Sequence, residues 1–234
     1  MRPMRLLLLS NSTNFGEKYL DHAMADIRAF LGPLKKLTFV PFALADHQAY
    51  AAKARERFAR EGIAVTPLVA ERGRADTLES AEAVFVGGGN TFRLLRALQT
   101  TGHADALRAR VSAGMPYIGA SAGTNIAAPT IKTTNDMPVV QPASFDALGV
   151  LPFQINPHFI DADAQSRHMG ETREERLREY LEENAAPVVG LREGAWLRRE
   201  DASLRLGGRN GARVFRRGAP PEDLAPGAAL DHLL

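Results

Sequence analysis

Residues 115–123 have the sequence MPYIGASAG, and this stretch decides the fold. The apolar run 115–118 predicts a short buried strand, and the small residues 119–123 predict a tight turn. A short helical stretch follows the turn. A buried strand that passes through a tight turn into a helix is the repeating unit of an α/β fold, so we expect similar units on both sides of it.

The same alternation extends from this unit toward both ends of the chain. Further strands are expected at 6–9, 37–40, 63–68 and 83–86, and helices at 17–31, 46–60, 91–98, 105–112 and 171–183. Short apolar strands that alternate with helices indicate an α/β fold with a doubly wound, mostly parallel sheet and helices on both faces.

Two segments depart from the alternation. Residues 130–145 are polar and contain prolines, which predicts a long loop over one edge of the sheet. Residues 188–215 contain short strand-like pieces broken by glycines, which predicts an antiparallel C-terminal edge. We find no repeat, linker or second core, and expect a single α/β domain over residues 1–234.

The composition narrows the class of protein. The chain has 234 residues, of which 45% are hydrophobic and 24% charged, which excludes disordered, collagen-like and coiled-coil proteins. The formal net charge is only +2, so there is no electrostatic footprint of nucleic-acid binding. The apolar run 6–9 is too short for a signal peptide, and no run approaches a membrane span. We expect a cytoplasmic enzyme, monomeric or homodimeric, that binds neither nucleic acid nor membrane.

Ser121 is the candidate nucleophile. The sequence has no cysteine, which excludes a cysteine nucleophile, thiolate metal sites and disulfides. Ser121 lies between Gly119 and Gly123 on the predicted strand-to-helix turn, and such glycines let the neighbouring backbone pass closely while the turn exposes the hydroxyl. The Ala122 N–H would be aimed at the same point. The alternative is a tight turn that merely needs small residues.

A glycine-rich segment, GGGNT at 87–91, follows another predicted strand. Consecutive glycines leave backbone N–H groups free to face a ligand, and the helix that begins near residue 91 adds its positive end. The segment lacks both the P-loop lysine and the G-x-G-x-x-G spacing, so phosphate binding is disfavoured. We expect the N–H of Gly88 or Gly89 to complete an oxyanion hole with Ala122. A plain glycine-rich turn is the alternative.

His158, in the sequence INPHF at 155–159, is the candidate general base because it closes an apolar strand. A third residue should orient its imidazole. Asp136 follows soon after the serine turn, and Glu193 comes just after a predicted strand. The spacing does not choose between these two carboxylates.

A metal site is the other way to use these polar residues. It would draw on His158, Asp161, Asp163 and His168. Their spacing matches no familiar ligand pattern, so we expect no metal.

Eight blocks spread through nearly the whole chain carry a family resemblance: LLSNS at 8–12, VGGGNTF at 86–92, YIGASAG at 117–123, PTIKTTNDMP at 129–138, FDAL at 145–148, QINPHF at 154–159, GETR at 170–173 and GLREGAW at 190–196. In these blocks the chain resembles peptidase E, the α-aspartyl dipeptidase family of serine peptidases. The resemblance implies a fold related to class I glutamine amidotransferases and flavodoxin, with serine in place of the amidotransferase cysteine. It also implies cleavage of dipeptides that begin with aspartate, without a metal or organic cofactor.

The resemblance places the family nucleophile at Ser121 and its histidine at His158. Both family candidates for the acid are present, at Asp136 and Glu193. We favour Glu193 as the residue that orients His158, so that Asp136 shapes the site or meets the substrate amino group. The reaction expected is acyl transfer through Ser121, followed by hydrolysis of the acyl-enzyme.

Selection of an aspartate side chain needs a cation. Arg173 and Lys132 lie in the matched blocks and are the candidates, and Asn90 is a further candidate for substrate binding.

Three other functions stay open on the sequence. They are a cyanophycinase-like hydrolase of an aspartate-backboned polymer, a generic serine esterase and a non-catalytic module that binds acidic amino acids.

Overall fold

The computed structural model describes residues 3–71, 76–162, 165 and 169–234. The larger of its two sheets has seven strands in the order β3-β2-β4-β5-β1-β8-β9. The bounds are β1 (Arg5–Leu9), β2 (Lys36–Val40), β3 (Ala64–Pro67), β4 (Val84–Val86), β5 (Tyr117–Ala120), β8 (Ala195–Glu200) and β9 (Ser203–Gly208). The five strands from β3 to β1 are parallel, whereas β8 and β9 pair antiparallel at the edge.

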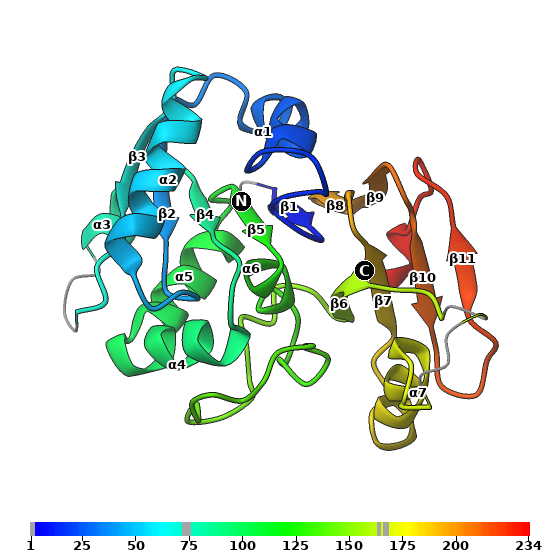
Figure 1. Cartoon of the computed structure of the whole chain (residues 1–234). Helices are drawn as coiled ribbons and strands as arrows, with labels where there is room; N and C mark the ends of the chain where they lie inside the picture. The colour runs from blue at the N-terminus through cyan, green and yellow to red at the C-terminus, as the bar shows by residue number, and fades with distance from the viewer. Residues whose placement is uncertain (1–2, 72–75, 163–164, 166–168) are drawn as a thin grey trace.

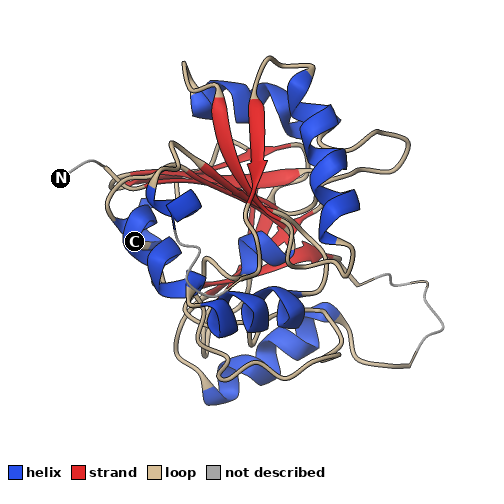
Figure 2. Ribbon diagram, turned by 90° about the vertical axis from the view of Figure 1, so that its left-hand side faces the viewer, coloured by secondary structure: helices blue, strands red, loops and turns tan. Residues whose placement is uncertain are grey.

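Helices cover both faces of this sheet (Figure 2). They are α1 (Met24–Leu31), α2 (His47–Ala59), α3 (Asp76–Glu79), α4 (Thr91–Thr101), α5 (His103–Ser112), α6 (Ala122–Asn125) and α7 (Arg173–Glu183), with 3₁₀ turns at Asp21–Ala23 and Asp231–Leu233. All except α7 pack on the seven-stranded sheet, with α1 and α2 on one face and α3 to α6 on the other.

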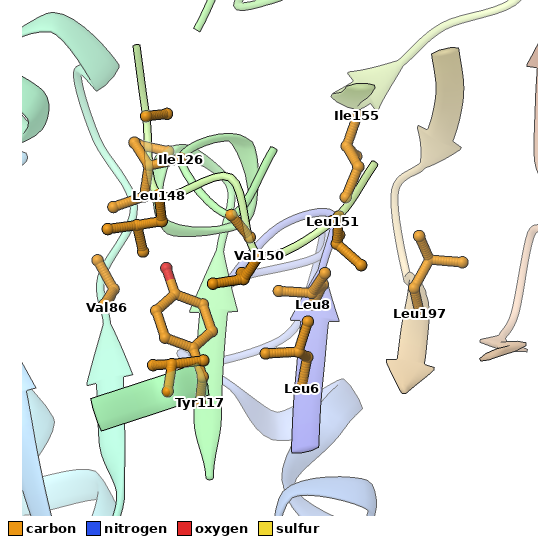
Figure 3. Close-up of a cluster of buried hydrophobic side chains, with 14 of the residues drawn as sticks. Leu6, Leu8, Val86, Tyr117, Ile126, Leu148, Val150, Leu151, Ile155 and Leu197 are labelled. Atoms are coloured by element: carbon orange, nitrogen blue, oxygen red, sulfur yellow. The ribbon is translucent and has the colours of Figure 1, made fainter. Parts of the chain in front are cut away.

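Strand β1 shows how one apolar run provides buried side chains for both faces of the large sheet. Successive side chains of a strand point in opposite directions, so an unbroken apolar run can be buried on both sides. Leu7 and Leu9 pack with α1 and α2, whereas Leu6 and Leu8 belong to the core on the other face. Figure 3 shows Leu6 and Leu8 beside Tyr117 in this second core.

A second sheet of four strands lies beside the first (Figure 1). Its order is β11-β10-β7-β6, with β6 (Gln154–Phe159), β7 (Val188–Arg192), β10 (Ala212–Phe215) and β11 (Glu222–Leu224). Ile155 of β6 and Leu191 of β7 join the same buried cluster as β1, so the two sheets share a core. On the outer face, Leu177 and Leu181 of α7 pack against Phe159.

The predicted α/β class, the mostly parallel sheet with helices on both faces and the antiparallel edge are confirmed. The four-stranded sheet was not predicted: of the strands within 188–215, only β8 and β9 join the edge of the large sheet. A short strand does not reveal in its own sequence which sheet it joins, because that depends on distant partners.

Several predicted boundaries also differ from the structure by one or more residues, and two of these differences have a clear cause. The helix expected at 17–31 begins only at Met24, because Leu20 has a left-handed backbone with φ 61° and a 3₁₀ turn follows it. The strand expected at 115–118 runs from Tyr117 to Ala120, because its pairing with β1 extends to Leu9 opposite Ala120. Among the described residues, no helix is both long and apolar enough to cross a membrane.

Candidate active site

Ser121 occupies a strained turn between β5 and α6. Its backbone has φ 52° and ψ −108°, a region that residues with a Cβ rarely adopt. Its N–H donates to the Leu9 carbonyl at 3.1 Å, and its own carbonyl accepts the N–H groups of Thr124 and Asn125 at 2.9 Å each. The strand ladder on one side and the helix on the other therefore hold the serine in this conformation.

The glycines on either side of Ser121 are required by close backbone approach. A Cβ on Gly119 would lie 2.5 Å from the Gly123 carbonyl oxygen, and a Cβ on Gly123 would lie 2.1 Å from the Val86 carbonyl oxygen. Both separations are far shorter than van der Waals contact. The G-x-S-x-G spacing thus lets α6 begin directly against β4 and β5.

His158 reaches the serine from the second sheet. The pairing of β6 with β7 shifts register between Pro157 and Phe159, which forms a bulge, and His158 has φ 53° there. A bulge redirects a side chain out of the regular alternation. The N–H of His158 donates at 2.9 Å to the hydroxyl of Ser10, which directly follows β1.

Three side chains form a continuous hydrogen-bonded chain. His158 Nε2 lies 3.0 Å from Ser121 Oγ, and His158 Nδ1 lies 2.7 Å from Glu193 Oε1. A carboxylate accepts from Nδ1–H, which fixes the tautomer in which Nε2 can accept the serine proton. Ser121 comes from the large sheet, His158 comes from the small one, and Glu193 lies in the turn that joins the two.

Glu193 lies in the tight turn between β7 and β8. Gly194 adopts φ 78° in this turn and donates its N–H to Asn11 Oδ1 at 2.8 Å. Asn210 Nδ2 donates to the Glu193 carbonyl at 2.7 Å. The loop after β1 therefore supports both the histidine, through Ser10, and the glutamate, through Asn11.

Asp136 occupies a different position. Its Oδ2 accepts the Thr91 N–H at 2.7 Å and the Thr91 hydroxyl at 2.6 Å, at the N-terminus of α4. A carboxylate there satisfies a free N–H and the helix dipole. Among the described contacts, Glu193 rather than Asp136 bonds the imidazole. Asp136 still lines the cavity beside Ser121.

Asn90 caps the same helix. Its Oδ1 accepts the Arg93 N–H at 3.0 Å, and its Nδ2 donates to the Met137 carbonyl at 2.8 Å. Unlike Asp136, it does not line the cavity.

The glycine-rich turn lies against the serine. A Cβ on Gly88 would lie 3.1 Å from Ser121 Cβ. Gly89 has φ 132°. Within the described part of the chain, the N–H groups of Gly89 and Ala122 donate to no acceptor. They are therefore available to a ligand beside the serine oxygen.

Tyr50 forms the wall behind this turn. Burial raises the pKa of its hydroxyl, and the backbone amide of Gly88 acts in the opposite direction because it donates toward the phenol oxygen. This places the Gly88 N–H next to Tyr50, so Gly89 and Ala122 are the less encumbered donors.

A cavity of about 620 Å³ opens over these groups. Among the described residues, two cations line it, Arg173 at the first position of α7 and Lys53 on α2. Burial lowers the pKa of the Arg173 guanidinium, and the nearby Arg176 lowers it further, whereas the charge of Asp136 raises it. Lys132, the other predicted cation, lies outside the cavity with its Nζ 3.4 Å from Asn184 Oδ1.

Sequence reasoning missed Lys53 and the supporting pair Ser10 and Asn11. Lys53 is one of several charged residues on the exposed face of α2, and no local pattern distinguishes it. Ser10 and Asn11 did carry a signal, because they are polar residues directly after a fully buried strand, where the sites of α/β sheets lie.

The four residues considered for a metal site do not lie together in the described part of the chain. In the ranges that the structure describes, no three His, Asp or Glu side chains gather as metal ligands. Asp161 is instead paired with Arg192, at 2.7 Å. Asp163 and His168 lie outside the described residues.

Comparison with known proteins shows the family of this chain. The model of peptidase family S51 matches residues 6–207. Peptidase E of Streptomyces coelicolor is 56% identical over 231 residues, covering 99% of this chain and 95% of that protein. A Drosophila melanogaster protein named probable alpha-aspartyl dipeptidase is 46% identical over 233 residues, covering 98% of this chain and 97% of that protein.

The fold is also found in a solved structure. The crystal structure of a peptidase from an acI-B1 Actinobacterium matches with a TM-score of 0.74 over 97% of this chain and 96% of that one, at 15% identity. At this identity the likeness concerns the fold alone. The family match and the near full-length relatives together show that this chain belongs to peptidase family S51.

Proposed function

We propose that this chain is a serine-type dipeptidase that hydrolyses Asp-Xaa dipeptides through an acyl-enzyme on Ser121. The observation that carries the proposal is the hydrogen-bonded chain from Ser121 through His158 to Glu193. These three residues line the same cavity as Arg173, Lys53 and Asp136. The name of the Drosophila relative and the family match support the same activity.

In this mechanism His158 Nε2 accepts the Ser121 proton while Oγ attacks the scissile carbonyl carbon. The negative oxygen that forms lies between the N–H groups of Ala122 and Gly89, with Gly88 adjacent. His158 then gives the proton to the leaving amine, and the C–N bond breaks. Water, deprotonated by His158, attacks the ester and releases aspartate, and the proton returns to Ser121. Glu193 stabilises the imidazolium in both halves.

Arg173 is our proposed reader of the substrate side chain. It is partly buried and lines the cavity, and in the described part of the chain it forms no ion pair. A guanidinium can donate two parallel hydrogen bonds to a carboxylate, whereas an asparagine amide offers it only one oxygen. Asp136, whose charge acts on Arg173, is suited to the substrate ammonium group on the same residue.

The test compares Asp-Leu, Asn-Leu and Ala-Leu as substrates of the wild type, Ser121→Ala and Arg173→Met. We expect the wild type to cleave Asp-Leu alone and Ser121→Ala to cleave nothing. We expect Arg173→Met to lose about 100-fold in kcat/KM on Asp-Leu, the size of a charge-assisted hydrogen bond in a partly buried site. Cleavage that survives in Ser121→Ala would refute the serine mechanism, and equal cleavage of Asp-Leu and Asn-Leu would refute the aspartate specificity.

A further inference from the structure

The charges of the cavity leave one cation without a role. Glu193 is committed to His158, so among the residues that the structure describes the remaining charged lining residues are Asp136, Arg173 and Lys53. An Asp-Xaa dipeptide at neutral pH carries one ammonium group and two carboxylates. The described part of the cavity therefore offers one anion and two cations to a substrate with one cation and two anions. The reaction proposed above uses Asp136 and Arg173 only.

The two cations come from opposite sides of the nucleophile. Lys53 is on α2, which packs on the large sheet, and Arg173 begins α7, which covers the small sheet. Figure 1 shows α2 and α7 on opposite sides, with the β5–α6 turn that carries Ser121 between them. A substrate whose scissile carbonyl lies at Ser121 therefore extends toward Arg173 in one direction and toward Lys53 in the other.

Asp136 decides which end of the substrate lies at Arg173. Asp136 and Arg173 both line the cavity, and the charge of Asp136 acts on Arg173, so we assign these two side chains to one subsite. The ammonium group and the side-chain carboxylate of the substrate both belong to its first residue, so a single residue satisfies both partners of that subsite. The second residue is then directed toward Lys53, and its only charged group of fixed position is the C-terminal carboxylate.

The ammonium group of Lys53 is available to bind such a carboxylate. Its Nζ lies 4.6 Å from the centre of the Tyr19 ring, within the range of a cation–π contact. In the residues that the structure describes, no carboxylate forms an ion pair with it. Tyr19 itself is buried and lines the cavity, so the exposed side chain of Lys53 lies along the cavity wall.

We propose that Lys53 binds the C-terminal carboxylate of the dipeptide and so favours substrates with a single residue after the scissile bond. This inference rests on the proposed function, because it takes the orientation of an Asp-Xaa substrate from it. One additional residue would move the carboxylate by about 3.5 Å and place a neutral peptide group near Lys53. The site would then favour dipeptides over longer peptides, because only a dipeptide places its C-terminal carboxylate next to Lys53.

The test removes each partner of the proposed ion pair in turn, the carboxylate from the substrate and the ammonium group from the protein. Asp-Leu and Asp-Leu-amide differ in the C-terminal carboxylate, and Lys53→Met removes its proposed partner while keeping most of the side-chain length. Lys36→Met is the matched control, because Lys36 is exposed and begins β2 at the opposite end of the sheet from the site. For each protein, kcat and KM are measured on both substrates at low ionic strength.

We expect amidation to lower kcat/KM of the wild type about tenfold, mainly through KM, because the pair is exposed and acts on binding. In Lys53→Met the two substrates should be cleaved equally, at about the rate of the wild type on the amide. Lys36→Met should keep the wild-type preference. Raised ionic strength should reduce the preference of the wild type but leave Lys53→Met unchanged.

Other outcomes overturn the inference in distinguishable ways. A wild-type preference that persists in Lys53→Met would show that another group binds the carboxylate. Equal loss on both substrates in Lys53→Met would show that Lys53 acts only on the structure of the site. Equal cleavage of both substrates by the wild type would refute the role of Lys53 but leave the dipeptidase intact. Cleavage of neither substrate by the wild type would refute the proposed function, and this inference with it.

Discussion

The Ser10 hydroxyl accepts the backbone N–H of His158 at 2.9 Å. The same hydroxyl donates to the Leu191 carbonyl at 2.8 Å, so one buried side chain joins the end of β1 to both β6 and β7. The bulge at His158 removes its N–H from the ladder with β7, and Ser10 provides the missing acceptor. The position of the imidazole thus depends on a residue that lies outside the cavity.

Ser10→Ala should therefore impair turnover more than binding. A displaced imidazole weakens proton transfer, so we expect kcat to fall about 10- to 100-fold with a smaller change in KM. The His158 N–H would lose its partner, at a cost of about 1–3 kcal/mol in the free energy of unfolding. Steady-state kinetics and urea unfolding measure the two effects.

Asp231→Ala is a suitable control for that loss of stability. Its carboxylate accepts the Leu204 N–H at 2.6 Å, in the C-terminal part of the chain. We expect it to reduce stability while kcat is retained. A similar fall in kcat in both variants would argue against a positioning role for Ser10.

Glu193→Gln and Asp136→Asn should have different kinetic effects. Glu193 contacts the imidazole, so its amide variant should lose on the order of 10⁴-fold in kcat. Asp136 caps α4 and lines the cavity, so Asp136→Asn should raise KM and cost about 1 kcal/mol of stability. Measurement of kcat and KM on Asp-Leu separates the two, and equal losses of kcat would contradict our assignment.

Ser121→Gly should be more stable than the wild type although it is inactive. The serine backbone at φ 52° and ψ −108° is unfavourable for any residue with a Cβ, at a cost of about 1–3 kcal/mol. Glycine removes that cost but also gains freedom in the unfolded chain, so we expect a net gain of about 1 kcal/mol, or about 2–4 °C in Tm. Ser121→Ala, equally inactive, should show no such gain. Equal melting temperatures would mean that the turn is not strained.

The acidic side chain of Asp223 should make stability dependent on pH. Hydrogen bonds from Arg213 and Arg192 lower the pKa of Asp223 from 3.8 to about 2, although burial acts in the opposite direction. A lowered pKa in the folded state stabilises the protein fully above pH 4, and this contribution is lost as the pH falls from about 4 to about 2.

Asp223→Asn tests this contribution. The variant should be less stable than the wild type at pH 6, by less than about 1 kcal/mol because the side chain is half exposed. The difference should shrink as the pH approaches 2. Urea unfolding of both proteins across this range provides the measurement, and a difference that is constant with pH would contradict the assignment.

The sequence predicted those parts of the site that depend on local backbone geometry. The turn at Ser121 and the strand end at His158 are each marked by a sequence pattern within a few residues. The choice between Asp136 and Glu193 had no local signature, because it depends on which strand end lies next to His158. That neighbour is the β7–β8 turn, and it is brought there by the pairing of β6 with β7.

The dependence on distant partners also explains why the four-stranded sheet was not predicted. Residues 188–215 form strands, as predicted, but their membership in two different sheets follows from contacts with β1 and β6. Lys53 is a further example: its place in the cavity comes from the packing of α2 against the sheet and from the ring of Tyr19. Neither relationship is visible in the residues that surround it in the chain.

The nucleophile and its base lie on different sheets, so the length of the hydrogen bond between Ser121 and His158 depends on how those two sheets are aligned. A small slide of one sheet against the other would lengthen this 3.0 Å contact long before any strand unravelled. The rate of turnover should therefore change before other properties do when the alignment of the two sheets changes. During gradual heating, activity should decline ahead of the loss of secondary structure, and it should return on cooling as long as the shared core has stayed closed.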